Sequence, residues 1–181
     1  MDSRDEATGE RLDGCDRAET VAANGPECVL ERDQAGVGGR QDLWSTGAAF
    51  VDYDRDGDLD LFVTNYVNWT RKSDLEIDFR LAGLGRAYGA PNHFTGTDNY
   101  LYRNDGNGRF SDVSRTAGIQ VHDPVSGLPV GKGLGIIALD YDRDGWLDLA
   151  FANDTARNFL FRNQGDGSFE ELGGFEGVAY D

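Results

Sequence analysis

The sequence predicts an all-β fold built from short antiparallel strands. The 181-residue chain contains 25 glycines, many of them in turn dipeptides, which is typical of a β protein with tight turns. Short apolar segments alternate with acidic loops and Asn/Gly-rich turns. The order of strand, acidic loop, strand and hairpin occurs twice, which indicates an internal repeat.

A nine-residue acidic segment occurs at 52–60 and again at 140–148, with carboxylates at positions 1, 3, 5 and 9 and a glycine at position 6. Such closely spaced carboxylates repel one another unless a cation neutralises them, and Ca²⁺ prefers oxygen ligands in irregular loops. We therefore expect two Ca²⁺ sites. The candidate ligands are Asp52, Asp54, Asp56, Asp58 and Asp60 in the first, and Asp140, Asp142, Asp144, Trp146 and Asp148 in the second.

The spacing within this segment has a mechanical reason. Alternate carboxylates point to one side of a turning backbone, and glycine at position 6 permits a sharp bend. Position 7 is Asp58 in one copy and Trp146 in the other, so we expect its backbone carbonyl to be the ligand. The segment is not an EF-hand, because position 12 is Val63 or Phe151 instead of Glu. The alternative is a solvated turn, which two copies in matching contexts disfavour.

Composition excludes several classes of protein. Hydrophobic content of 39% and aromatic content of 11% argue against a disordered acidic tail. A net charge of −16 disfavours nucleic acid and anionic membranes as partners and suits a protein that holds cations. No apolar run approaches the ~18 residues of a membrane span, and residues 1–20 are too polar for a secretory signal. Cys15 and Cys28 are either one disulfide or two free thiols.

The first repeat is expected at residues 34–119 and the second at 120–181, after an irregular segment of residues 1–33. The strands around the two acidic loops lie 88 residues apart in the sequence. We expect their apolar side chains to point into a core: Phe50, Leu61, Val63, Ile137, Leu149 and Phe151.

Two hairpins, at 99–110 and 158–169, are offset by only 59 residues. Their turns contain Asp and Asn, but we interpret them as positive-φ turns and not as metal loops. The shorter offset implies a 29-residue insertion in the first repeat, within residues 66–97, with a short helix at 73–84. Such insertions often bind ligands, and the alternative is a structural flap.

A short phrase that ends in Gly followed by Val or Ile recurs at 34–37, 116–119 and 175–178. The last copy keeps the 59-residue offset of the hairpins, and another strand and acidic loop would follow it in a longer array. We therefore expect the sequence to be part of a larger repeat array.

The D-x-D-x-D-G-x-L-D-L core and the N-x-L-[YF]-R-N-x-G-[ND]-G-x-F hairpin, each present twice, resemble the FG-GAP (VCBS) repeat family over residues 34–181. The likeness is greatest to secreted proteins that carry an ASPIC/UnbV domain. The resemblance implies a partial β-propeller of integrin-α type with antiparallel four-stranded blades. It also implies Ca²⁺ in the loop between the first two strands of each blade, and further blades as partners.

Three functions are compatible with the sequence. We expect a Ca²⁺-stabilised extracellular or cell-surface scaffold that binds protein or glycan, and no enzyme activity. The alternatives are an accessory region of a secreted hydrolytic enzyme and a purely structural spacer. His93 and His122 lack a nucleophile motif nearby, which disfavours catalysis.

Other residues leave the nature of a ligand open. Trp44, Trp69, Tyr88 and Phe94 form either a sugar-stacking surface or ordinary packing contacts. Asn68 and Asn153 begin glycosylation sequons, which matter only in a eukaryotic secretory pathway.

Overall fold

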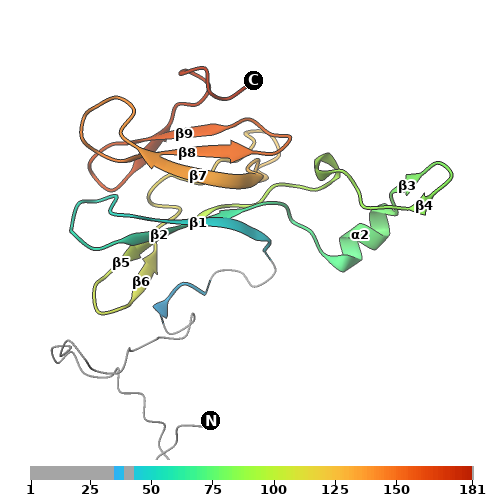
Figure 1. The fold of residues 1–181 in the computed structure, drawn as a ribbon, viewed down its shortest axis with the longest axis horizontal. Helices are drawn as coiled ribbons and strands as arrows, with labels where there is room; N and C mark the ends of the chain where they lie inside the picture. The colour runs from blue at the N-terminus through green and yellow to red at the C-terminus, as the bar shows by residue number, and fades with distance from the viewer. Residues whose placement is uncertain (1–34, 39–42, 181) are drawn as a thin grey trace, which may run out of the picture.

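The computed structural model describes residues 35–38 and 43–180, and shows two four-stranded antiparallel sheets stacked face to face (Figure 1). Each sheet is a meander, with orders β1-β2-β5-β6 and β7-β8-β9-β10. This nearly all-β architecture confirms the prediction of partial β-propeller blades. The strands are β1 (Ser45–Val51), β2 (Asp60–Asn65), β5 (Tyr100–Asn104), β6 (Phe110–Asp112), β7 (Gly133–Leu139), β8 (Asp148–Asn153), β9 (Phe159–Asn163) and β10 (Phe169–Glu171). The segment 1–33 and both cysteines lie outside the described residues.

The hydrophobic core lies between the two sheets. Phe62 of β2 is fully buried, and its ring centroid lies 4.9 Å from that of Phe151 in β8. Phe151 also packs edge-on against Phe161 of β9, at 5.4 Å. The residues joined by these contacts are aromatic and belong to one core cluster that both sheets share, so burial of their apolar surface holds the sheets together.

The prediction of core residues was partly wrong. Leu149 and Phe151 are buried, but Phe50 and Ile137 are 63% and 60% exposed, and Leu61 and Val63 are half-buried. The second sheet lies on the first without being turned over. The first sheet therefore contacts the second with one face, and the second contacts the first with the opposite face. Ala49 and Phe62 pair across β1 and β2 on the covered face of the first sheet, while Phe50 pairs with Leu61 on the other face.

A pair of hydrogen-bonded asparagines holds together the two ends of the insertion at the first sheet. The backbone N–H of Asn65 donates to Asn99 Oδ1 at 2.9 Å, and Asn65 Nδ2 donates to the Asp98 carbonyl at 2.7 Å. In the second sheet Asn153 makes the same two bonds across a five-residue separation, to Asn158 Oδ1 and the Arg157 carbonyl. The same two asparagine hydrogen bonds, which we call the asparagine clamp, therefore close both the long connection in the first sheet and the short connection in the second.

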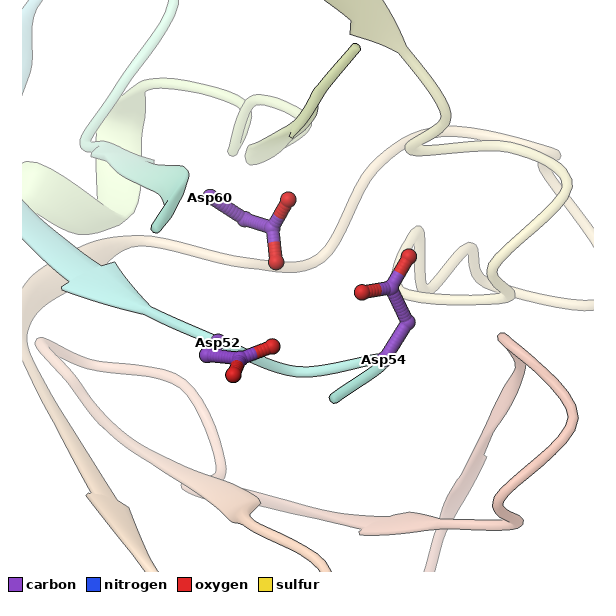
Figure 2. Close-up of side chains that lie close together, drawn as sticks. All are labelled: Asp52, Asp54 and Asp60. Atoms are coloured by element: carbon purple, nitrogen blue, oxygen red, sulfur yellow. The ribbon is translucent and has the colours of Figure 1, made fainter. Parts of the chain in front are cut away.

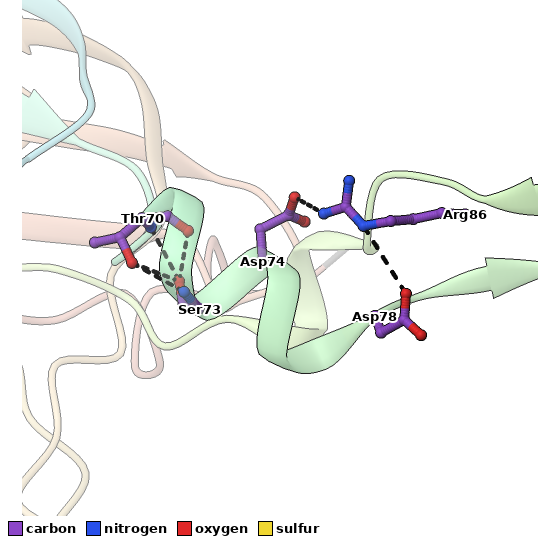
Figure 3. A network of polar contacts seen from close by, with 5 residues as sticks. All are labelled: Thr70, Ser73, Asp74, Asp78 and Arg86. Atoms are coloured by element: carbon purple, nitrogen blue, oxygen red, sulfur yellow. Dashed lines mark hydrogen bonds and ion pairs between the residues drawn. The ribbon is translucent and has the colours of Figure 1, made fainter.

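The insertion holds helix α2 (Arg71–Ile77), the hairpin strands β3 (Arg80–Leu81) and β4 (Gly85–Arg86), and the 3₁₀ helix η1 (Pro91–His93). The expected helix at 73–84 was wrong in extent. The observed helix begins earlier, at Arg71, because the Thr70 side chain caps it by accepting from the Ser73 N–H. It ends at Ile77, because the next residue, Asp78, takes a left-handed conformation. Arg86 returns from the hairpin to pair with Asp74 of α2 (Figure 3).

The recurring glycine phrase connects one unit to the next. Gly118 has φ +76°, and the Phe169 N–H of β10 donates to the carbonyl of the preceding Ala117 at 2.8 Å. A Cβ on Gly118 would lie 3.0 Å from the Phe169 carbonyl, and one on Gly36 would lie 2.1 Å from that of Phe110. The phrase thus contacts the outer strand of a sheet, except at Gly177, where an added Cβ would meet no atom within 4 Å.

We predict that Phe62→Ala lowers the free energy of unfolding by ~3–5 kcal/mol, because it leaves a cavity at the sheet–sheet contact. Phe50→Ala, on the exposed face of the same sheet, should change it by less than ~1 kcal/mol. Urea unfolding followed by circular dichroism measures both values. Equal losses in the two variants would contradict the assignment of faces.

Candidate metal centres

The two acidic loops have the same backbone conformation. Arg55 and Arg143, at position 4, have φ values of 60° and 64°, and the glycines at position 6, Gly57 and Gly145, have 96° and 90°. A left-handed conformation is unfavourable for arginine, so each loop contains local strain that its bonds must offset.

Three carboxylates gather in each loop. Asp52 and Asp54 follow β1, and Asp60 begins β2, so the two strands bring positions 1, 3 and 9 together (Figure 2). Their nearest oxygens lie within 4.8 Å of one another, as do those of the equivalent set in the second loop, Asp140, Asp142 and Asp148. Negative charges at this spacing repel strongly, and a bound cation would relieve that repulsion.

Positions 5 and 7 lie outside these clusters. Asp56 Oδ1 accepts the N–H of Asp58, and Asp144 Oδ1 accepts the N–H of Trp146, both at 2.8 Å. These bonds hold the turn at position 6. The roles of positions 5 and 7 as metal ligands stay predictions.

The position 9 carboxylates have a second role that the sequence did not reveal. Asp60 is fully buried and accepts from the N–H groups of Tyr53, at 3.1 Å, and Asn104, at 2.8 Å. Asp148 accepts from Tyr141 and Asn163 in the same way. Each therefore joins its loop to the strand of the following hairpin. The asparagine that recurs in both hairpins was the sequence feature from which this role could have been predicted.

Burial of these carboxylates disfavours their charged form. It raises the pKa of Asp60 to about 6, although the two backbone N–H donors act in the opposite direction. Burial likewise raises the pKa of Asp148, and burial together with the charge of Asp56 raises that of Asp54. An ionised cluster at neutral pH is therefore unfavourable without a counter-charge.

One buried carboxylate oxygen favours a bound cation as the counter-charge. Asp52 Oδ1 is inaccessible to solvent and has no hydrogen-bond partner in the structure. An unpaired buried carboxylate oxygen is costly, and a cation held by Asp52, Asp54 and Asp60 would satisfy it. The donors are all oxygens, which fits a hard divalent ion such as Ca²⁺.

The first loop also contacts the second. The Arg55 guanidinium stacks over the Trp146 ring, with its carbon 4.4 Å from the ring centroid. Asn163 Nδ2 donates to the Tyr53 carbonyl across the sheets at 2.8 Å. Trp146 at position 7 thus contributes a contact between the loops.

The hairpin turns differ from these loops. Gly106, Asn107 and Gly108 all have positive φ, as do Gly165 and Gly167, which confirms the interpretation of these segments as tight turns. His93 and His122 are exposed, and His122 Nε2 lies 2.9 Å from Asp98 Oδ1. Among the described residues, no helix has the length and apolar character of a membrane span.

A model of the FG-GAP-like repeat matches residues 140–179. The match begins at the second acidic loop and runs through β8, β9 and β10 to the third glycine phrase. It confirms an FG-GAP-like repeat in the second half of the chain. No curated protein matches the chain.

We predict that the metal-stripped protein melts several degrees higher at pH 5 than at pH 7.5. The raised pKa values mean that the folded state binds more protons than the unfolded state between about pH 4 and 6, so stability falls as pH rises through this window. Excess Ca²⁺ should reverse the trend, because it binds the ionised carboxylates. Thermal scans at both pH values test this, and a metal-free protein that is more stable at pH 7.5 would contradict it.

Proposed function

We propose that the two loops bind Ca²⁺ and that the stabilised sheets form a scaffold, extracellular or at the cell surface, that binds protein or glycan. The observation that carries the metal proposal is the buried, unpartnered Asp52 oxygen beside two other carboxylates. FG-GAP-like repeats are typical of extracellular proteins, and a net charge of −16 suits an environment rich in divalent cations.

A bound Ca²⁺ supplies positive charge at the junction of two strands and a hairpin. Asp52 and Asp54 would hold it from the end of β1, and Asp60 from the start of β2. Because Asp60 also accepts from Asn104 in β5, fixing its carboxylate fixes the register of three strands. The metal role is therefore structural, and ligand binding is expected elsewhere on the scaffold.

Calorimetric titration of the metal-stripped protein is expected to show two Ca²⁺ sites. Asp54→Asn and Asp142→Asn should each reduce the number to one and lower the melting temperature in Ca²⁺, because each removes a charge from one cluster. Asp166→Asn is the matched control, since this residue accepts from Ser168 in a hairpin turn. Unchanged stoichiometry in both loop variants would refute the ligand assignment.

We also propose that the free face of the second sheet receives a neighbouring blade of the same kind. Ile137, Ala150 and Leu160 are equivalent to Ala49, Phe62 and Leu101, which the second sheet covers. They line an open, largely apolar groove of about 600 Å³, which Val178 borders. The unpartnered Gly177 lies beside it, where its two counterparts meet an outer strand.

This docking can be tested by extending the chain. A second copy of residues 120–179, added directly after residue 178 to keep the 59-residue spacing, is expected to raise the melting temperature. Ile137→Asp should then cost ~2–4 kcal/mol in the extended chain, where the residue is covered, and less than ~1 kcal/mol in the present chain, where it is exposed. Equal costs in the two chains would contradict the proposal.

A further inference from the structure

The inserted segment and Trp44, which immediately precedes β1, enclose an aromatic pocket of about 230 Å³. The insertion projects from the sheets on the side opposite the acidic loops (Figure 1). The pocket brings together residues that are far apart in the sequence, including all four aromatic side chains that the sequence singled out. The residues that matter for its chemistry are Trp44, Tyr66, Trp69, Asp74, Tyr88 and Phe94.

The inner rings are held in place by the sheets. Trp44 packs edge-on against Tyr66 and Trp69, with centroid distances of 5.7 and 6.3 Å. The Tyr66 N–H donates to the Trp44 carbonyl at 2.9 Å, and the Tyr66 hydroxyl donates to Asp154, which follows β8. The pocket wall is therefore fixed before any ligand arrives.

Two of the rings keep a face open to solvent. Trp44 is 52% exposed and Tyr88 is 84% exposed, so packing within the insertion does not use their full surface. The second repeat closes the same connection with Asn153 and Asn158 and has no such segment, so the sheet itself does not require the pocket. These two facts favour a binding role over a structural flap.

The charged side chain that lines the pocket is that of Asp74, and its charge is paired. Asp74 is 5% exposed and its carboxylate pairs with Arg86, which itself lies 3.9 Å from Asp78 (Figure 3). Because Asp74 is already paired, it offers no free charge to a cation. The carboxylate still accepts hydrogen bonds, and a sugar hydroxyl can donate one to it.

We propose that this aromatic pocket binds a neutral saccharide. One face of a sugar ring carries C–H groups that pack on aromatic rings, while its hydroxyls bond to a few polar groups at the edge. Trp44 and Tyr88 would contact the ring face, and the Asp74 carboxylate, which Arg86 holds in place, would accept from the hydroxyls. This inference rests on the proposed scaffold function and specifies its ligand as glycan.

Tryptophan fluorescence gives a direct test on the full chain in excess Ca²⁺. Two of the three tryptophans line the pocket, and the third, Trp146, lies at an acidic loop. A panel of glucose, galactose, mannose and N-acetylglucosamine is titrated, with calorimetry as the second readout. At least one sugar is expected to give a saturable change that persists in Trp146→Phe.

Variants locate the site. Trp44→Ala and Tyr88→Ala should each weaken sugar binding by about tenfold or more, through loss of ring contact. Tyr180→Ala is the matched control, since this tyrosine is 76% exposed and lies outside the pocket. A circular dichroism spectrum and a melting temperature equal to those of the unmodified chain show that each variant is folded.

The outcomes separate the two proposals. Binding of Ca²⁺ without any sugar, or binding of tetramethylammonium in place of sugars, overturns the saccharide inference and leaves the metal proposal intact. Sugar binding that Trp44→Ala and Tyr88→Ala leave unchanged also overturns it. Sugar binding that these variants abolish, in a chain that takes up no Ca²⁺, would support the pocket and refute the metal centres.

Discussion

A fully buried carboxylate at the start of the second strand is the feature on which each sheet depends. Asp60 and Asp148 receive two backbone N–H groups each, one from the preceding loop and one from the following hairpin. They thereby connect three strands at one end of the sheet. The same carboxylates face two others from their loop, so the connection that orders the sheet also concentrates negative charge. A divalent cation would resolve that conflict without removing the hydrogen bonds.

The second sheet lies on the first without being turned over, and this arrangement explains why each sheet is apolar on both faces. In a two-layer sandwich each sheet has one covered face, and alternate residues are polar. Here both faces of each sheet are apolar, as Phe62 and Phe50 show in the first sheet and Phe151 and Ile137 in the second. Such two-faced strands suit a sheet that lies between two neighbours, as blades do in a propeller.

The repeat itself was predictable from the sequence, since strands, loops and hairpin turns follow from local patterns of Asp, Gly and alternating apolar residues. Which face of each strand points into the core was not predictable. A strand that is apolar on both faces shows no alternation of apolar and polar residues, as Phe50 and Ile137 show. The helix in the insertion was mispredicted because Asp78 adopts a left-handed conformation that its sequence context does not reveal. The convergence of Trp44 with Tyr88 depends on the path of the insertion, which no local pattern encodes.

The asparagine clamp explains how one repeat could acquire an extra segment without loss of its sheet. Asn65 and Asn99 close a 34-residue separation with the bonds that Asn153 and Asn158 make over five residues. The entropic cost of a longer loop grows only slowly with its length, so a fixed closure tolerates a large insertion. The clamp also lies at the end of the strands remote from the acidic loops, since Asn65 ends β2 and Asn153 ends β8. The end with the acidic loops can therefore remain constant to maintain the sheets, while the other end accepts an inserted segment.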